Sequence, residues 1–211
     1  MSLGNTAGSV LPEALSSVVA SGTAAIVAVA AAIPLAVLTV RFVGPRTRLL
    51  ESLTWASYSL PHLAVGLGFL VVTIRFVPAI YQSFVVLIVA YVAMFLPLAL
   101  ASAQTGLRQV GPNLEDASRS LGVGPLATLA RVTVPLVGGS LVAGGALVFL
   151  TVMKELPATL LLRPTGFETL AVRIWSAATE LFYTEASVAA LVLVGASAVP
   201  LYLLVARGLH D

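Results

Sequence analysis

Long runs of uncharged, mostly apolar residues alternate with short polar segments along this chain. About 20 consecutive apolar residues in a helix cross the roughly 30 Å core of a bilayer. Five runs reach that length: 14–40, 52–74, 76–107, 132–153 and 186–206. We expect helices, because lipid offers no partner for backbone polar groups and the runs lack the two-residue alternation of a barrel strand. The pattern therefore predicts an all-α integral membrane protein, built as a bundle of about five transmembrane helices.

Composition supports the membrane assignment and argues against several other classes of protein. The 211 residues are 59% hydrophobic and 9% charged, and the mean hydropathy is +1.04, whereas a soluble domain carries about 25% charged residues. With no cysteine and two histidines, we expect no disulfide, metal site or other cofactor on this chain. The basic residues are scattered over loops without interleaved aromatic residues, which argues against nucleic-acid binding.

The basic residues also predict the orientation in the inner (plasma) membrane, since cytoplasmic loops are rich in Lys and Arg. Five spans place the termini on opposite sides. One side would hold Arg41, Arg46, Arg48, Arg108, Arg119, Arg131 and Arg207; the other would hold only Arg75, Lys154, Arg163 and Arg173. The richer side is predicted to be cytoplasmic, with the N-terminus outside. We expect an extracytoplasmic tail over 1–13, a transmembrane domain over 14–207 and a cytoplasmic tail over 208–211; the N-terminus lacks the basic region of a signal peptide.

A polar passage, "NLEDASRSLGVGPLATLARVTVP" at 113–135, interrupts the apolar sequence. Asn113 is a good N-cap with Asp116 at the capping-box position, and carboxylates suit the first turn of a helix. Glu115 and Arg119 are four residues apart, in the order that favours a pair along one helix. Gly122 is placed to end this helix in a left-handed conformation. The passage therefore begins with a helix of about two turns.

A second helix is predicted after the glycines. Gly124 gives another break, Pro125 suits the first position of a helix, and 126–134 would run back toward the membrane until Pro135. The cytoplasmic segment 108–135 is thus read as helix, elbow and helix. A helix shorter than about 12 residues is marginal in water and needs something to dock against. Leu114, Ala117 and Leu121 share one face, which suits a groove on a soluble partner; capping the bundle or resting on lipid headgroups is the alternative.

The other polar segments lie on the predicted outer side. Over 156–185, Thr165 and Glu168 have capping-box spacing, and an amphipathic pattern follows, which predicts an interfacial helix or else a loop that covers the bundle. Lys154 and Glu155 would lie within a long helix that Pro157 kinks, at a depth where charges face a cavity or a partner. These three residues are candidates for a pathway or outer gate.

Two alternatives at these charges remain open. Lys154 could extend to the headgroups while Glu155 caps a local turn. His62, inside the second span, is either a pathway residue or a polar link to a neighbouring helix.

The polar passage resembles the cytoplasmic EAA loop of ABC-importer permeases. That pattern is E-A-A, three residues, G, nine residues and I-x-L-P. Here it falls, with its spacings kept, on Asp116, Ala117, Ser118, Gly122, Val132, Val134 and Pro135. The resemblance implies that residues of this loop couple the bundle to an ATPase: Glu115, Asp116, Ala117, Ser118, Arg119, Gly122 and Pro135.

The resemblance covers about 16–204 and is most specific in "KELPATLLLRP" and "TLAVRIW", which look like the second half of a ferric-iron ABC transporter permease. It implies a non-enzymatic permease that forms the path for ferric iron. A cytoplasmic ABC ATPase dimer would bind ATP and Mg, and an extracytoplasmic binding protein would deliver the substrate. Because permeases of that type have two homologous halves, a second half or a second copy is also implied.

Other functions are weighed against this one. A permease for another small ion, such as sulfate, molybdate or a thiamine-like cation, would carry the same loop. A secondary transporter would use ionisable groups or broken helices near the midplane, and Pro34, Pro97 and the Gly66–Gly68 segment are possible breaks. A membrane assembly subunit would only hold a partner. Catalysis is not expected, because a phosphate-binding loop, metal-ligand spacing and a nucleophile–base pair are all missing from the sequence.

Overall fold

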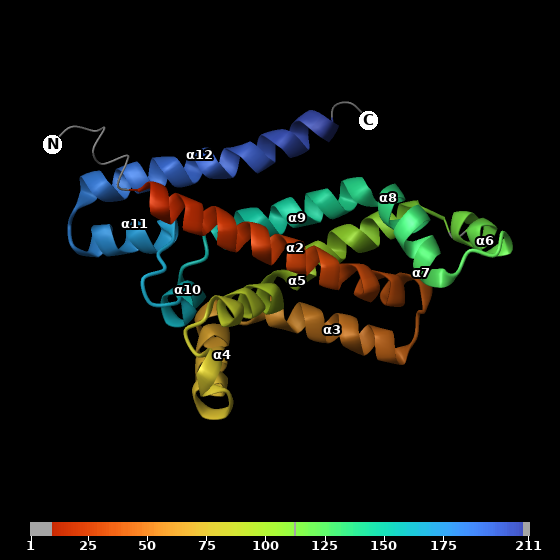
Figure 1. The fold of residues 1–211 in the computed structure, drawn as a ribbon, viewed down its shortest axis with the longest axis horizontal. Coiled ribbons are helices and arrows are strands. Elements are labelled where there is room, and N and C mark those ends of the chain that lie inside the picture. The colour runs from red at the N-terminus through yellow and green to blue at the C-terminus, as the bar shows by residue number, and fades with distance from the viewer. Residues whose placement is uncertain (1–9, 112, 209–211) are drawn as a thin grey trace.

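The computed structural model describes residues 10–111 and 113–208, and this part of the chain consists of helices and connecting loops (Figure 1). The predicted all-α fold is confirmed. In chain order the elements are α2 (Leu11–Arg41), α3 (Pro45–Ser59), α4 (His62–Phe76), the 3₁₀ turn η1 (Pro78–Ile80), α5 (Phe84–Gln109), α6 (Asn113–Ser120), α7 (Pro125–Thr128), the π-helix η2 (Leu129–Thr133), α8 (Val134–Leu136), α9 (Gly138–Met153), α10 (Pro157–Leu162), α11 (Leu170–Thr179) and α12 (Tyr183–Gly208).

The centre of the molecule is a bundle of α2, α5 and α9. Small residues let these helices approach closely. On α2, alanines recur every four residues and are fully or almost fully buried: Ala20, Ala24, Ala28, Ala32 and Ala36. The larger side chains of α5 belong to the same hydrophobic core, with Leu87, Tyr91, Met94 and Phe95 at most 1% exposed. Small-residue stripes of this kind are typical of helix pairs in membranes, where close backbone contact supplies the packing energy.

Five apolar segments correspond to the five predicted spans, although two of them are bent pairs of helices and not single continuous spans. Helices α2 and α5 are each long and apolar enough to cross a membrane alone. The pairs α3–α4 and Pro125–Leu136 with α9 qualify only jointly, since they are bent by 105° and 74°. Helix α12 runs unbroken from Tyr183 to Gly208 and includes the predicted run 186–206.

Two of the predicted spans are not continuous helices over their predicted length. The run 52–74 breaks at Leu60, whose extended backbone (φ −78°, ψ 146°) is the conformation favoured before a proline, here Pro61. The run 76–107 begins with the turn η1 instead of a helix, and α5 starts at Phe84 after Ser83, whose hydroxyl accepts a hydrogen bond from the Val86 amide at 3.4 Å. Hydropathy alone does not register these local breaks.

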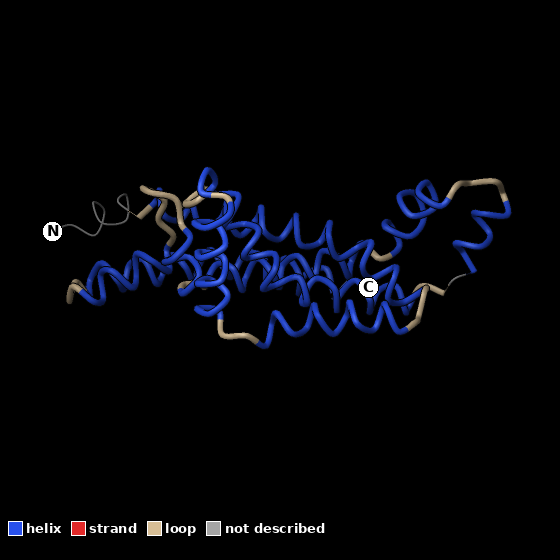
Figure 2. The backbone as a smooth tube through the Cα atoms, turned by 90° about the horizontal axis from the view of Figure 1, so that it is seen from below, coloured by secondary structure: helices blue, strands red, loops and turns tan. Residues whose placement is uncertain are grey.

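The elements at the two ends of the bundle differ in character (Figures 1 and 2). Helices α6 and α7 form a hairpin that projects beyond one end, whereas α11 lies at the opposite end beside the start of α12. Helix α4 extends sideways from the bundle (Figure 1). The coupling and outer segments predicted from the sequence therefore lie at opposite ends of the molecule.

The predicted start of the outer helix is four residues too early. Thr165 and Glu168 do not form a capping box: the Thr165 hydroxyl donates to the Gln82 side chain at 3.3 Å, and Glu168 pairs with Arg163 at 3.1 Å. A turn through Gly166 (φ +78°) precedes Phe167, whose ring packs against that of Phe84 with centroids 5.7 Å apart. Thr169 is the actual N-cap of α11.

Candidate functional site

The helix–elbow–helix interpretation of the polar passage 113–135 matches the structure. Helix α6 includes Asn113, which was predicted to cap it, and residue 112 before it lies outside the described residues. Gly122 has a left-handed φ of +81°. Its amide donates to the Arg119 carbonyl at 2.9 Å, and the Val123 amide donates to the Ser118 carbonyl at 3.2 Å. These two bonds form a Schellman motif, in which a glycine avoids the steric penalty of a Cβ atom.

The second arm of the elbow continues one residue further than predicted. Gly124 is extended, and Pro125 occupies the first turn of α7. The helix passes through the π turn η2 and through Pro135, and it ends at Leu136 before the 74° bend into α9. A π turn redistributes the backbone hydrogen bonds that a following proline disturbs. The π turn and the bend separate the hairpin from α9.

The sequence spacing predicted that Glu115 pairs with Arg119, but in the structure Glu115 pairs with Arg41. It is 7% exposed, and its Oε1 accepts hydrogen bonds from Arg41 Nη2 at 3.1 Å and from the Thr133 hydroxyl at 3.2 Å. A buried carboxylate requires charged or hydrogen-bonding partners, and Arg41 provides them from the end of α2. Arg119 instead lies 4.0 Å from Asp116, with both side chains more than half exposed.

Helix α6 therefore has distinct inner and outer faces. Glu115 and Ser118 point inward, and the Ser118 and Thr128 hydroxyls lie 3.1 Å apart across the elbow. Leu114 and Leu121 are 52% and 84% exposed, and Ala117 beside them is exposed as well. The apolar residues predicted to share a face do share one, and it is turned away from the bundle.

The second group of candidate residues lies where α9 ends. The helix stops at Met153 and does not continue through Lys154 and Glu155, so the predicted long kinked helix is wrong. Pro157 does not kink it, because this proline occupies the first turn of the separate helix α10. A proline is tolerated there because the first amides of a helix have no intrahelical acceptor.

Glu155 is a buried link between two helices. It is 5% exposed, and Oε2 lies 2.7 Å from His62 Nδ1 at the start of α4. Its Oε1 accepts a hydrogen bond from the Ala158 amide at 3.1 Å and so caps α10. Lys154 is exposed. Of the alternatives raised by the sequence, the local cap at Glu155 and the interhelical link through His62 are both present.

Sequence reasoning missed two further members of this polar cluster. Thr159 donates to the Glu155 carbonyl at 2.6 Å, and its hydroxyl lies 2.7 Å from that of Tyr91 on α5. The His62 ring packs edge-on against Phe95, with centroids 5.2 Å apart. Tyr91 and Thr159 are isolated hydroxyls within apolar runs, which is a weak signal without the fold. Together the cluster joins α4, α5 and α10.

A family model described as "Binding-protein-dependent transport system inner membrane component" matches residues 24–211. The chain belongs to this family. As a family member with long apolar helices, it is an integral protein of the inner membrane.

Several curated relatives of this family member are transport permeases. The Fe(3+)-transport system permease protein FbpB 2 of Haemophilus influenzae is 34% identical over 188 residues, which are 89% of this chain and 37% of that protein. A probable molybdenum ABC transporter permease of Haloferax volcanii is 34% identical over 194 residues, covering 88% of this chain and 71% of that protein. A putative 2-aminoethylphosphonate permease, PhnV of Salmonella paratyphi A, is 30% identical over 142 residues, covering 67% and 54%. The chain thus spans only about a third to a half of the length of FbpB 2 and PhnV.

A solved structure shares the fold of this family member. It is an inward-facing MetNI methionine ABC transporter, with a TM-score of 0.76, 14% sequence identity, and coverage of 97% of this chain and 96% of that one. At this identity the likeness concerns the fold alone. It shows that the chain has an ABC importer permease fold.

Proposed function

We propose that this chain is a permease subunit, or half-subunit, of an ATP-binding-cassette importer. The observation that carries the proposal is the outward apolar face of α6, formed by Leu114, Ala117 and Leu121 at the projecting end of the bundle. A short amphipathic helix presented in this way suits a groove on a soluble protein. The partner would be a cytoplasmic ABC ATPase dimer, which binds ATP and Mg and carries out hydrolysis, so this chain would be a non-enzymatic component.

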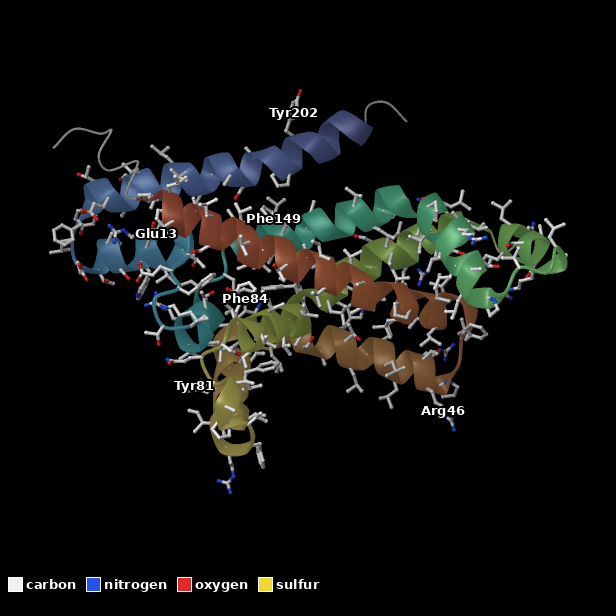
Figure 3. All side chains as sticks on the ribbon, in the orientation of Figure 1. Glu13, Arg46, Tyr81, Phe84, Phe149 and Tyr202 are labelled. Atoms are coloured by element: carbon white, nitrogen blue, oxygen red, sulfur yellow. The ribbon has the colours of Figure 1, made fainter. Side chains whose placement is uncertain are left out.

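The proposed orientation follows the basic residues. The hairpin end, with Arg41, Arg46 and Arg119, would be cytoplasmic, and the α11 end would be outside. Arg46 projects away from the bundle at the hairpin end (Figure 3), as expected of a residue beside anionic headgroups. An extracytoplasmic binding protein would then dock at the α11 end, where Arg163 and Arg173 form ion pairs at 3.1 and 2.7 Å.

A second permease half, or a second copy of the chain, would complete the path. Helix α4 leaves the bundle and carries an apolar groove of about 370 Å³, lined by Leu60, Ala64, Val65, Gly68, Phe69 and Val72. One hairpin would engage one ATPase subunit, whereas alternating access usually involves two related halves.

Since the chain has no native cysteine, a cysteine at Val71 on α4 should crosslink to a partner in membranes. A chain that transports as a monomer would contradict the pairing.

Ferric iron is the substrate we propose, supported by the similarity to FbpB 2 over 89% of this chain. Molybdate is the second candidate, because the probable molybdenum permease is equally identical and is matched over 71% of its own length. The two ions are distinguished by uptake of radioactive iron and of molybdate in cells that express the complete transport system. Uptake of molybdate but not iron would replace the first candidate by the second, and uptake of neither would remove both.

Gly122→Val should release the ATPase from the chain. A β-branched residue at φ +81° is strained, by roughly 1–2 kcal/mol or more, so the elbow that presents α6 would be distorted. The measurement is the amount of ATPase that copurifies with the chain in detergent.

Gly124→Val is the matched control for this experiment. Gly124 has an extended backbone, and a Cβ atom there would meet no atom within 4 Å. ATPase retention should therefore stay at the wild-type level. Equal retention by both variants would mean that the elbow does not present the ATPase-binding helix.

A further inference from the structure

The attachment of α6 to the bundle is mainly polar. Its leucines, Leu114 and Leu121, are turned outward, so they do not hold it against the other helices. Instead, one carboxylate oxygen of Glu115 accepts hydrogen bonds from Arg41 of α2 and from Thr133 of η2. An eight-residue helix is too short to be stable alone, so side-chain contacts of this kind determine where it sits.

Arg41 makes the connection broader than a single ion pair. The same Nη2 atom that bonds Glu115 also donates to the Val110 carbonyl at 2.8 Å, at the end of α5. The Arg41 side chain is 15% exposed and that of Glu115 is 9% exposed. Charge-assisted bonds in such a shielded place are stronger than surface ion pairs. The guanidinium and carboxylate therefore join the ends of α2 and α5 to α6 and η2.

Two routes lead from Glu115 into the bundle. Through Thr133 the route enters η2 and reaches α9 only after the π turn and the 74° bend. Through Arg41 the route enters α2, a 31-residue helix that continues unbroken through Pro34 and whose alanine stripe packs on the core. A continuous helix transmits a displacement along its length, whereas a hinge absorbs part of it.

We propose that Arg41 and Glu115 are positioning residues that carry the movement of α6 directly into α2, so that α2 responds to ATP binding as one unit with the hairpin. This inference rests on the proposed function, because it requires an ATPase that moves α6. In this arrangement Glu115 makes no contact with the ATPase. The exposed neighbour Asp116 would contact the ATPase instead, and Glu115 transmits the movement inward.

The test is hydrogen–deuterium exchange on the permease–ATPase complex, comparing the nucleotide-free state with the state trapped by MgATP and orthovanadate. In the wild type, peptides covering α6 and residues 38–44 at the end of α2 should both change their exchange on trapping. Glu115→Gln keeps an acceptor for Thr133 but removes the charge that holds Arg41. It should retain the ATPase and the change in α6 but lose the change in 38–44, and Arg41→Lys should act in the same direction.

Two further variants separate transmission from a merely structural role. Thr133→Val removes the other hydrogen-bond donor to Glu115 while keeping nearly the same side-chain shape. In this variant the change in hydrogen exchange of residues 38–44 should persist. Arg41→Glu alone and Glu115→Arg alone should each abolish the change in exchange at 38–44. The double variant, which carries both substitutions, should restore it. Thr105→Ala, which loses only an exposed bond to its own helix, serves as the neutral control.

The possible failures are distinguishable. An unchanged 38–44 response in Glu115→Gln, or no such response in the wild type, would overturn the transmission through Arg41. Loss of the ATPase from the Glu115→Gln complex would overturn it too, by showing that Glu115 only holds α6 in place for docking. If the wild-type chain retains no ATPase at all, the proposed function fails, and the inference fails with it.

Discussion

Gly144→Val should destabilise the bundle severely, whereas Gly139→Val on the same helix should leave it nearly unchanged. A Cβ atom built on Gly144 lies 2.8 Å from Ser102 Cβ and 3.2 Å from the backbone Cα of Ala99. Backbone atoms of α5 cannot move aside, so α5 and α9 must separate. Overpacking of this kind costs about 3 kcal/mol, and the close-packed interface between the two helices would be lost.

Gly139 provides the comparison because a Cβ atom there meets nothing within 4 Å. The measurement is unfolding of the purified chain in mixed detergent micelles, followed by circular dichroism. Gly144→Ala should give an intermediate loss, reduced by the 0.5–1 kcal/mol or so that alanine gains over glycine in a helix. Equal stability of the two valine variants would show that α5 and α9 are not held together at Gly144.

The parts of the fold that the sequence predicted correctly depend on local information. The number and position of the apolar segments follow from hydropathy. The elbow follows from Gly122, Gly124 and Pro125, because the backbone preferences of glycine and proline act at the residue itself. The family resemblance was correct for the same reason, because the EAA pattern is defined by residue spacing within one loop. These features require no knowledge of which helices are neighbours.

The errors concern contacts between distant segments and breaks within apolar runs. The partner of Glu115 is Arg41, 74 residues away, and not Arg119 at helical spacing. The partner of Glu155 is His62, 93 residues away. A local pair gains only a few tenths of a kcal/mol on an exposed helix, so a buried tertiary partner outweighs it. The break at Leu60 was missed because its signal is one proline inside an otherwise apolar run.

The polar cluster around Glu155 combines two roles that the sequence presented as alternatives. The carboxylate caps α10 through the Ala158 amide and links α10 to α4 through His62. The same two helices are in close backbone contact, since a Cβ atom on Gly66 would lie 3.1 Å from Ala158 Cα. Helices α4 and α10 are therefore fastened together, on the part of the molecule away from the α6 hairpin (Figure 1). We propose that this junction belongs to the outer gate.

Glu155→Gln should leave the chain folded and bound to the ATPase but reduce transport by about tenfold or more, the effect of losing roughly 1.4 kcal/mol of a charge-assisted contact. Glutamine still offers an oxygen to the Ala158 amide, so α10 keeps its cap, and its amide group can still bond His62. Glu155→Ala, by contrast, leaves the Ala158 amide and His62 without their acceptor and should cost about 1–3 kcal/mol in stability.

Transport should be measured per membrane-inserted molecule, together with basal ATP hydrolysis by the complex. Lys154→Met is the companion variant, because Lys154 is adjacent but exposed. Without its positive charge at the junction, the resting state of the gate should shift and basal hydrolysis should change, while the Glu155–His62 link stays intact. If both Glu155→Gln and Lys154→Met transport at the wild-type rate, then the Glu155–His62 link only fastens α4 to α10, and the gate must lie elsewhere.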